Sequence, residues 1–298
     1  MSERKQVGVI GFPVKHSLSP VIHNAALNAL GIDAAYRTFE VRPGEVAAFL
    51  ASRPAEFLGT NVTIPHKQEV VACVQRLSPV ARATGAVNTV VRKVDADGSF
   101  SWFGDNTDVE GFAAPLRRLD ADALRRLEGG RVVVLGAGGA ARAVALSVRS
   151  FAPSRVTVVA RNVARARRLV KELRRADVIA AETPDTSILD FATMAFDSER
   201  LHEAVAGADL IVNATPVGLT PNGDLSPLPG HTFHVTQIVY DLIYRPRRTR
   251  LLLDAERDGA QVIDGMEMLI EQAAASFVQW FGVAMPIPDV RRALAEIE

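Results

Sequence analysis

Cysteine is almost missing from this sequence. The single residue, Cys73, excludes a disulfide within the chain and excludes a zinc site built from cysteine ligands. The six histidines include no HxxxH pair, the spacing at which two imidazoles on one helix face hold a metal ion. We therefore expect a protein whose chemistry uses no bound metal ion.

An excess of charge of one sign is also missing, as is any long apolar run. Lysine plus arginine and aspartate plus glutamate number 34 each, so net charge gives no reason to expect a nucleic acid or a membrane surface as partner. No run reaches the roughly 18 apolar residues of a membrane span, and MSERKQVGVIGF has no apolar stretch of signal-peptide length. We expect a soluble, cytoplasmic protein. The sequence does not decide between a monomer and a homodimer.

What the chain does contain is a regular alternation of strand and helix patterns. Its 298 residues predict two domains. Short apolar runs alternate with amphipathic stretches, which predicts strands at 6–11, 34–41 and 56–63 separated by helices at 20–30 and 44–52. This order predicts a mostly parallel sheet. Ser19 is expected to cap the first helix, and a further helix is expected near 66–73.

The second part of the chain repeats the alternation. Two strands around the turn DADG (95–98) and a helical stretch at 107–128 lead into it. A second parallel sheet is then predicted from strands at 131–136, 155–161, 208–215, 237–244 and 260–264. The segment 176–207 shows poor periodicity and receives no firm assignment, whereas Met266 to Phe281 predicts a long amphipathic helix.

The turn GAGGAA (136–141) fits the pattern G-x-G-x-x-G/A between a strand and a helix. Gly136 would permit the tight turn, and Gly138 would let the backbone approach a pyrophosphate at the helix N-terminus. The turn therefore predicts dinucleotide binding, although a glycine-rich turn that only packs helix on strand remains the alternative.

The end of the next strand indicates which dinucleotide. NAD-binding folds usually place an acidic residue there, but this strand reads VTVVARNVARARR. Arg161 stands at its end and Arg165 lies one helical turn later, so two guanidinium groups are offered to a 2′-phosphate. We therefore favour NADP over NAD. For Arg167, Arg168 and Arg175 we prefer a solvated helix face.

Lys67 in GTNVTIPHK (59–67) presents a puzzle. It falls in what the pattern predicts to be the first turn of a helix, where the helix macrodipole disfavours a cation. Taken alone, Lys67 is best interpreted as a surface lysine, Ser19 as a helix cap, and Asp108 in GDNTDVEG as a cap of the following helix. For Ser17, a structural and a functional role are equally supported.

Several motifs together resemble the shikimate dehydrogenase family over nearly the whole chain. The segments that carry the resemblance occur in the family's order: GFPVKHSLSPVIHN, GTNVTIPHK, GAVNT, GDNTDVEG, GAGGAARA, NATPVG, YDLIY and DGMEMLIEQ. The resemblance implies an α/β fold with two domains. One is an N-terminal substrate domain (1–107) with a mostly parallel sheet, to which C-terminal helices (265–298) return. The other is a Rossmann-like NADP-binding domain (108–264), and the substrate is expected between the two.

The resemblance also implies roles for particular residues. Lys67 is expected to be catalytic, partnered by Asp108. Expected substrate ligands are Ser17 and Ser19 for the carboxylate, Asn61, Thr63, Asn88 and Asp108 for the ring hydroxyls, and Lys67, Tyr244 and Gln272 as further contacts. The expected NADP site consists of Gly136, Ala137, Gly138, Gly139, Ala140, Arg161, Arg165, Thr215 and Gly265.

The implied reaction is reversible, NADP-dependent reduction of 3-dehydroshikimate to shikimate. A ketone reduction needs a hydride, which the nicotinamide supplies, and a proton, which a positioned lysine can donate. The alternatives are a quinate or aminoshikimate dehydrogenase and a non-catalytic NADP-binding regulatory module. Two departures from the family pattern stand out: ARN (160–162) replaces NRT, and Glu267 replaces a glycine.

Overall fold

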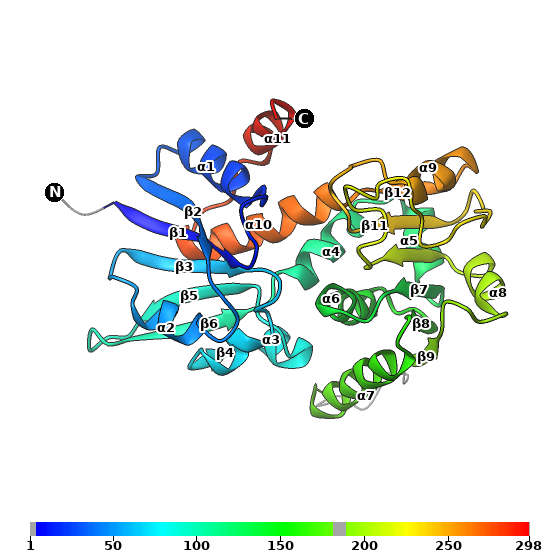
Figure 1. Cartoon of the computed structure of the whole chain (residues 1–298), viewed down its shortest axis with the longest axis horizontal. Helices are drawn as coiled ribbons and strands as arrows, with labels where there is room; N and C mark the ends of the chain where they lie inside the picture. The colour runs from blue at the N-terminus through cyan, green and yellow to red at the C-terminus, as the bar shows by residue number, and fades with distance from the viewer. Residues whose placement is uncertain (1–3, 181–188, 298) are drawn as a thin grey trace. The chain divides into compact units, whose positions relative to one another are not determined.

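The computed structural model describes residues 4–180 and 189–297. The chain divides into two compact units, the first comprising Met1–Asp108 and Ile270–Glu298 and the second Val109–Leu269 (Figure 1). Part of the segment 176–207, residues 181–188, lies outside the described residues. No helix in the described part of the chain is long and apolar enough to cross a membrane.

The first unit is built on a six-stranded mixed sheet in the order β2-β1-β3-β5-β6-β4. Its strands are β1 (Lys5–Gly11), β2 (Ala34–Glu40), β3 (Phe57–Val62), β4 (Arg76–Leu77), β5 (Thr89–Val94) and β6 (Phe100–Asp105). β1 runs parallel to β2 and β3, and β4 runs parallel to β6, whereas β5 is antiparallel to β3 and β6. The sheet is mostly parallel, as expected, and the antiparallel pair β5–β6 is the predicted hairpin around 95–98.

Short helices and two C-terminal helices complete this unit. They are α1 (Ser19–Ala29), α2 (Val46–Ala51), the 3₁₀ helix η1 (Glu69–Ala72), α3 (Pro79–Thr84), α10 (Gly265–Phe281), which begins in the second unit, and α11 (Ile287–Ala295). α1 packs against α11. An apolar core that includes Ile10, Phe57 and Val62 fixes β1 and β3, whose carboxyl ends lead into the site described below.

The second unit contains a fully parallel sheet in the order β12-β11-β10-β7-β8-β9. Its strands are β7 (Arg131–Leu135), β8 (Arg155–Val159), β9 (Asp190–Met194), β10 (Leu210–Asn213), β11 (Ile238–Asp241) and β12 (Gln261–Ile263). Numbered from β7, this is the strand order of a dinucleotide-binding fold, with the reversal between β7 and β10. The near-continuous apolar runs of these strands follow from burial of both faces.

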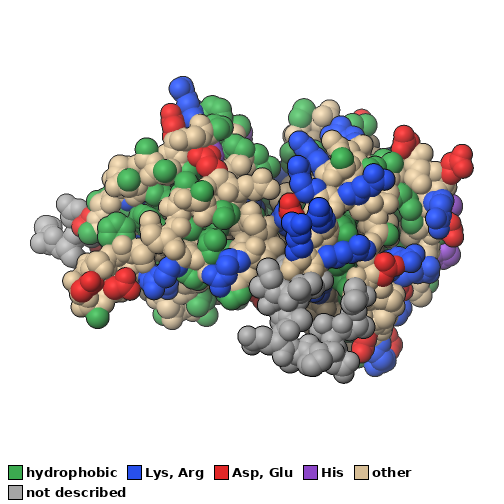
Figure 2. All heavy atoms as spheres, turned by 90° about the horizontal axis from the view of Figure 1, so that it is seen from below, with side chains coloured by type: hydrophobic (Ala, Val, Ile, Leu, Met, Phe, Trp, Pro, Cys, Tyr) green, Lys and Arg blue, Asp and Glu red, His purple; other side chains and the backbone are tan. Residues whose placement is uncertain are grey.

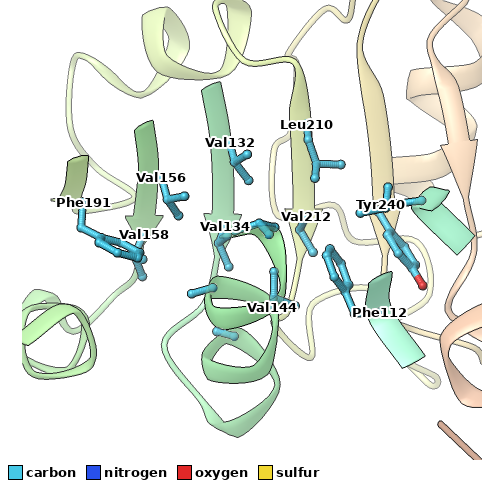
Figure 3. Packing of buried hydrophobic residues seen from close by; sticks show 14 of the residues in the cluster. Phe112, Val132, Val134, Val144, Val156, Val158, Phe191, Leu210, Val212 and Tyr240 are labelled. Carbon is cyan, nitrogen blue, oxygen red and sulfur yellow. The ribbon is translucent and has the colours of Figure 1, made fainter. Parts of the chain in front are cut away.

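Helices cover this sheet and share its core. They are α4 (Asp108–Arg117), α5 (Ala121–Leu127), α6 (Gly139–Ser147), the 3₁₀ helix η2 (Val148–Phe151), α7 (Val163–Ala180), α8 (Leu201–Ala206) and α9 (Arg250–Arg257). Figure 3 shows valines of β7 and β8 facing the same way as Leu210 and Val212 of β10, with Val144 of α6 below them. Phe112 stacks on Tyr240 at 4.8 Å between ring centroids, which ties α4 to β11.

Candidate active site

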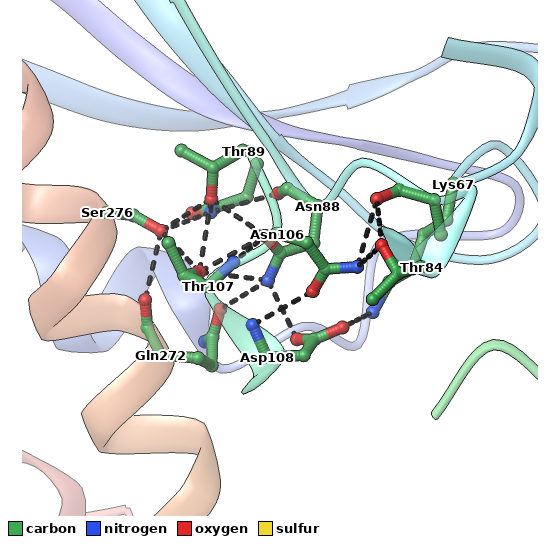
Figure 4. A network of polar contacts seen from close by, with 11 residues as sticks. Lys67, Thr84, Asn88, Thr89, Asn106, Thr107, Asp108, Gln272 and Ser276 are labelled. Atoms are coloured by element: carbon green, nitrogen blue, oxygen red, sulfur yellow. Dashed lines mark hydrogen bonds and ion pairs between the residues drawn. The ribbon is translucent and has the colours of Figure 1, made fainter. Parts of the chain in front are cut away.

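Lys67 and Asp108 form an ion pair in the first unit. Lys67 Nζ lies 2.6 Å from Asp108 Oδ2, and the side chains are 23% and 7% exposed (Figure 4). The lysine reaches the pair from the segment after β3, and the aspartate is the first residue of α4. A nearly buried carboxylate and a half-buried ammonium are therefore held in direct contact, 41 residues apart in sequence.

The helix expected near 66–73 is wrong at its beginning. Residues 64–68 form a turn, and only Glu69–Ala72 is helical, as a 3₁₀ helix. The Lys67 carbonyl accepts a hydrogen bond from Val87 N–H at 2.7 Å, a contact between distant segments that takes the place of a helical one. Lys67 therefore does not lie in the first turn of an α-helix, and the macrodipole gives no argument against it.

The buried side chain of His66 fixes the turn that carries Lys67. Its ring is fully buried, with Nε2 2.7 Å from the Val41 carbonyl and Nδ1 3.2 Å from Glu69 Oε2. The backbone at the start of the turn is also fixed, because Thr63 N–H donates to the Ile10 carbonyl and His66 N–H donates to the Thr63 carbonyl. The backbone on either side of Lys67 is thus held by the sheet, which leaves its side chain free to project toward Asp108.

Asn88 fixes the other oxygen of the carboxylate. Its Nδ2 donates to Asp108 Oδ1 at 2.7 Å, while its Oδ1 accepts from Thr107 N–H at 2.7 Å. A backbone N–H can only donate, so this contact fixes which end of the amide is oxygen. The Asp108 backbone N–H in turn donates to Asn106 Oδ1 at 3.2 Å, so at the start of α4 the accepting side chain is that of Asn106 and not that of Asp108.

Asn61 lies deeper, and its polar atoms already have protein partners. Tyr36 OH donates to Asn61 Oδ1 at 2.8 Å, and Asn61 Nδ2 donates to Ser276 Oγ at 2.9 Å and to the Asn88 carbonyl at 3.2 Å. The residue is 5% exposed. In this arrangement Asn61 stabilises the position of Asn88 by its hydrogen bond to the Asn88 carbonyl.

The remaining expected ligands of this unit have distinct settings. Ser17 and Thr63 are half-buried, whereas Ser19 and Gln272 are buried. The Thr63 methyl lies against Gly11, where a Cβ would come within 2.5 Å of Thr63 Cγ2. Gln272 Oε1 accepts from Asn88 Nδ2 at 3.4 Å, which places the α10 side chain beside the Asn88–Asp108 contact.

Ser19 does not cap α1, contrary to expectation. It is the first residue of the helix, and no side chain caps that end. Instead, the Ser17 hydroxyl accepts the Ser19 backbone N–H at 3.2 Å, so Ser17 takes the local structural role expected of Ser19. The Ser19 hydroxyl contacts Tyr36, whose pKa is raised well above its ordinary value by burial despite that hydrogen bond.

Four polar residues of this site were not found from the sequence: Tyr36, Thr89, Thr107 and Ser276. They come from β2, β5, the loop before α4 and α10, and each of the four hydrogen-bonds Asn88 or Asn61 directly. The spacing of Gln272 and Ser276, four apart in a largely apolar helix, is a signal that could have indicated a shared polar face.

In the second unit, the glycine turn offers an open helix N-terminus. Gly136 has φ of +114°, and a Cβ there would lie 2.8 Å from the Ala214 carbonyl, so this glycine is required by the close approach of β7 and β10. Gly138 and Gly139 face open space with no atom within 4 Å of a built Cβ. Packing therefore does not explain these two glycines. Space for an anion at the start of α6 would explain them, and a dinucleotide pyrophosphate fits that position.

The loop after β10 is fixed to β10 and β11 by a short chain of hydrogen-bonded side chains. Thr215 Oγ1 donates to Asn213 Oδ1 at 2.7 Å, and Asn213 Nδ2 donates to Asp241 Oδ1 at 3.0 Å. Burial raises the pKa of Asp241 to about 6, although hydrogen bonds from Ile243, Thr249 and Asn213 oppose the shift. Thr215 thereby stands beside Gly136, at the reversal point of the strand order.

Arg161 and Arg165 stand exposed where β8 leads into α7. Within the part of the chain that the structure describes, neither forms an ion pair, so both guanidinium groups are available to an anion. Asn162 accepts the Arg165 backbone N–H at 3.1 Å and so begins α7. Figure 2 shows lysine and arginine side chains gathered on this face of the second unit.

Three residues from the sequence analysis remain. Gly265 and Tyr244 are expected site residues, and Glu267 is a departure from the family pattern. A Cβ at Gly265 would lie 2.4 Å from the Leu242 carbonyl, so close packing of α10 on the chain after β11 requires this glycine. Tyr244 is half-buried, and burial raises the pKa of its phenol. Glu267 accepts from Arg118 at 3.0 Å, which gives this acidic replacement an ion-pair partner at the end of α4.

The two units thus carry functional groups that suit different ligands. The first offers a lysine–carboxylate pair with buried amides and hydroxyls, which suits a small polyhydroxylated molecule and a proton transfer to it. The second offers an open helix N-terminus at a strand-order reversal and two exposed arginines, Arg161 and Arg165, at the end of β8, which suits a phosphorylated dinucleotide.

Comparisons with known proteins agree with this description. Three family models match the chain: the shikimate dehydrogenase substrate binding domain over residues 9–90, shikimate / quinate 5-dehydrogenase over 118–217, and the shikimate 5'-dehydrogenase C-terminal domain over 265–295. The shikimate dehydrogenase (NADP(+)) of Salinibacter ruber is 43% identical over 292 residues, which cover 97% of this chain and 96% of that protein.

Solved structures of related enzymes share the fold. Shikimate 5-dehydrogenase from Thermus thermophilus, in complex with NADP(H) and shikimate, is 33% identical with a TM-score of 0.79 and covers 99% of this chain and 100% of that chain. Quinate dehydrogenase from Corynebacterium glutamicum, in complex with NAD, is 28% identical with a TM-score of 0.84 and covers 98% of this chain and 99% of that chain. The fold is therefore shared by relatives with different substrates and cofactors.

Proposed function

The chain belongs to the shikimate dehydrogenase family, and on that premise we propose that it catalyses the reversible, NADP-dependent reduction of 3-dehydroshikimate to shikimate. The observation that carries the proposal is the contact of 2.6 Å between Lys67 Nζ and Asp108 Oδ2, with Asn88 holding the second carboxylate oxygen. Retention of this constellation argues against a silent cofactor-binding module.

In the proposed reaction the first unit binds the substrate and supplies the proton. Lys67 donates a proton to the substrate carbonyl oxygen as the alcohol forms, and in the reverse direction takes it from the hydroxyl. Asp108 orients the ammonium and accepts a hydrogen bond from the reacting hydroxyl. Ser17 and Ser19 hold the carboxylate, and Thr63, Asn88 and Gln272 hold the remainder of the molecule, with Asn61 bonded to Asn88. Tyr244 of the second unit is a further proposed substrate contact.

The second unit binds the cofactor, which when bound supplies or accepts the hydride. The backbone of the turn formed by Gly136, Ala137, Gly138, Gly139 and Ala140 would hold the pyrophosphate, and Arg161 and Arg165 would bind the 2′-phosphate. Thr215 and Gly265 line the remainder of the site. In this proposal 1–107 with 265–298 serves mainly the substrate and 108–264 mainly the cofactor, with Asp108 and Gly265 at the boundaries as exceptions.

Quinate is the strongest competing substrate, because a quinate dehydrogenase shares this fold with a TM-score of 0.84. Ser17, Ser19 and Thr63 together favour shikimate. The purified protein should be assayed with shikimate and quinate, each crossed with NADP and NAD, by the absorbance of the reduced cofactor. We expect the highest kcat/KM with shikimate and NADP. A preference for quinate or NAD would replace the proposed substrate or cofactor, and no turnover with any pair would favour the regulatory module.

A further inference from the structure

Ser276 occupies the centre of the buried polar network in the first unit. It lies on α10, is fully buried, and is one helical turn beyond Gln272. Its hydroxyl oxygen is 2.9 Å from Asn61 Nδ2, 2.8 Å from Thr89 Oγ1, 3.1 Å from Thr107 Oγ1 and 3.0 Å from the Gln272 carbonyl oxygen (Figure 4). One serine thus joins α10 to β3, to β5 and to the segment that carries Asp108.

The direction of these hydrogen bonds follows from the partners. The Gln272 carbonyl can only accept, so it takes the Ser276 hydroxyl proton. Asn61 Nδ2 can only donate, and its orientation is fixed because it also donates to the Asn88 carbonyl. The second lone pair of Ser276 is left for a threonine hydroxyl. Every hydrogen-bonding position of Ser276 is therefore used, and its orientation is fixed.

The network extends from Ser276 to both sides of the site. On one side, Thr89 Oγ1 and Thr107 Oγ1 lie 3.0 and 3.1 Å from Asn88 Oδ1, so the threonine that does not give its single proton to Ser276 can donate it to Asn88, and Asn88 holds Asp108. On the other side, Ser276 and Gln272 share one face of α10, and Gln272 Oε1 meets Asn88 Nδ2 at 3.4 Å. The rotation of α10 about its axis decides where Gln272 lies relative to Asn88 and Asp108.

We propose that Ser276 is a positioning residue for the substrate site, acting through Gln272. Apolar side chains could pack α10 against the sheet, but apolar contacts are non-directional and leave rotation of the helix weakly specified. A fully satisfied buried hydrogen-bond network specifies one arrangement. Ser276 fixes α10 in the rotation that holds the Gln272 amide beside the Asn88–Asp108 contact. This inference rests on the proposed function, because it assumes that shikimate binds here.

A double-mutant cycle tests this role. The dissociation constant for shikimate should be measured by calorimetry for the wild type, Ser276→Ala, Gln272→Ala and the double variant. We expect Ser276→Ala to weaken shikimate binding about tenfold, in keeping with one to two lost hydrogen bonds. The same substitution should have little further effect when Gln272 is already alanine. The dissociation constant for NADP should stay near the wild-type value in all four proteins.

Matched controls separate positioning from general destabilisation. Ser147→Ala removes a buried helical serine hydroxyl from α6 in the second unit and should leave shikimate affinity unchanged. Ser276→Cys keeps the side-chain volume with a weak hydrogen-bonding group, and it should weaken shikimate binding if Ser276→Ala does not fold. Wild-type affinity in a folded Ser276 variant, or equal effects of Ser276→Ala with and without Gln272, would overturn the proposal. Failure of the wild type to bind shikimate would instead overturn the proposed function.

Discussion

At the residue scale, the ion pair between Lys67 and Asp108 is expected to add little to the stability of the fold. Taking two charges largely out of water costs free energy that their mutual attraction barely offsets, and an apolar pair of similar volume would often be as stable. The pair is nevertheless held by Asn88 on one side and by the turn after β3 on the other. Its retention is therefore better explained by proton transfer than by folding.

Cofactor selectivity also belongs to the residue scale. We predict that Arg161→Ala raises KM for NADP about 10- to 100-fold, because charge-assisted hydrogen bonds to a phosphate are worth about 1.5–3 kcal/mol. KM for NAD should hardly change, since NAD lacks the 2′-phosphate. Steady-state kinetics with both cofactors provide the measurement. Arg167→Ala is the matched control, an exposed arginine of α7 that should affect neither constant. Equal losses with NADP and NAD would remove Arg161 from this role.

The glycine turn makes a prediction at the scale of an element. Gly138→Ala adds a methyl group in open space at negative φ, so the folded protein should lose only the difference between glycine and alanine at a helix N-cap, about 1 kcal/mol. The methyl group should nevertheless obstruct the pyrophosphate and raise the dissociation constant for NADP at least tenfold. Gly136→Ala should instead lower thermal stability, because its Cβ would meet the Ala214 carbonyl at positive φ.

Differential scanning fluorimetry with and without NADP separates these two effects. Gly138→Ala should unfold near the wild-type temperature but gain less stabilisation from the cofactor. A Gly138→Ala protein with wild-type NADP affinity would show that the open space is not used by the pyrophosphate.

Elements also show how far sequence reasoning reaches. Ten strands of the two sheets were predicted because their apolar runs are local signals, whereas β4 and β9 were not, and the glycine turn was found because a strand and a helix flank it. The helix near 66–73 was wrong because the Lys67 carbonyl bonds to Val87, a contact that no local pattern encodes. Ser19 was misjudged because a serine before a proline suits either the cap or the first turn.

Buried polar residues were the hardest to predict. Tyr36, Thr89 and Ser276 look like ordinary strand and helix residues, and they gain partners only when segments up to 215 residues apart meet. The family resemblance supplied Lys67, Asn88 and Asp108, whereas the supporting network became visible only in three dimensions.

At the scale of the whole molecule, one buried carboxylate should shape stability against pH. Burial raises the pKa of Asp241 from 3.8 to about 6, so the folded protein binds this proton more tightly than the unfolded chain does. The resulting penalty is absent below pH 3.8, grows as pH rises toward 6, and is fully present above that, at about 3 kcal/mol. The contribution of Asp241 to the free energy of unfolding therefore becomes less favourable as the pH rises.

Asp241→Asn should remove this dependence, because an amide carries no charge at any pH. Urea unfolding of the wild type and the variant at several values between pH 4 and 7 provides the measurement. We expect the stability of the variant relative to the wild type to increase with pH across this window. A constant difference would show that Asp241 titrates alike in the folded and unfolded states.

The central claim, that Lys67 transfers the proton in shikimate oxidation and 3-dehydroshikimate reduction, is tested most directly by the kcat of Lys67→Ala. We predict a decrease of about 10²–10⁴-fold, the usual contribution of general acid–base catalysis, with NADP affinity near the wild-type value. Lys93→Ala, the same change at an exposed lysine of the first unit, should retain full kcat. A Lys67→Ala protein that keeps most of its kcat would contradict the proposed mechanism.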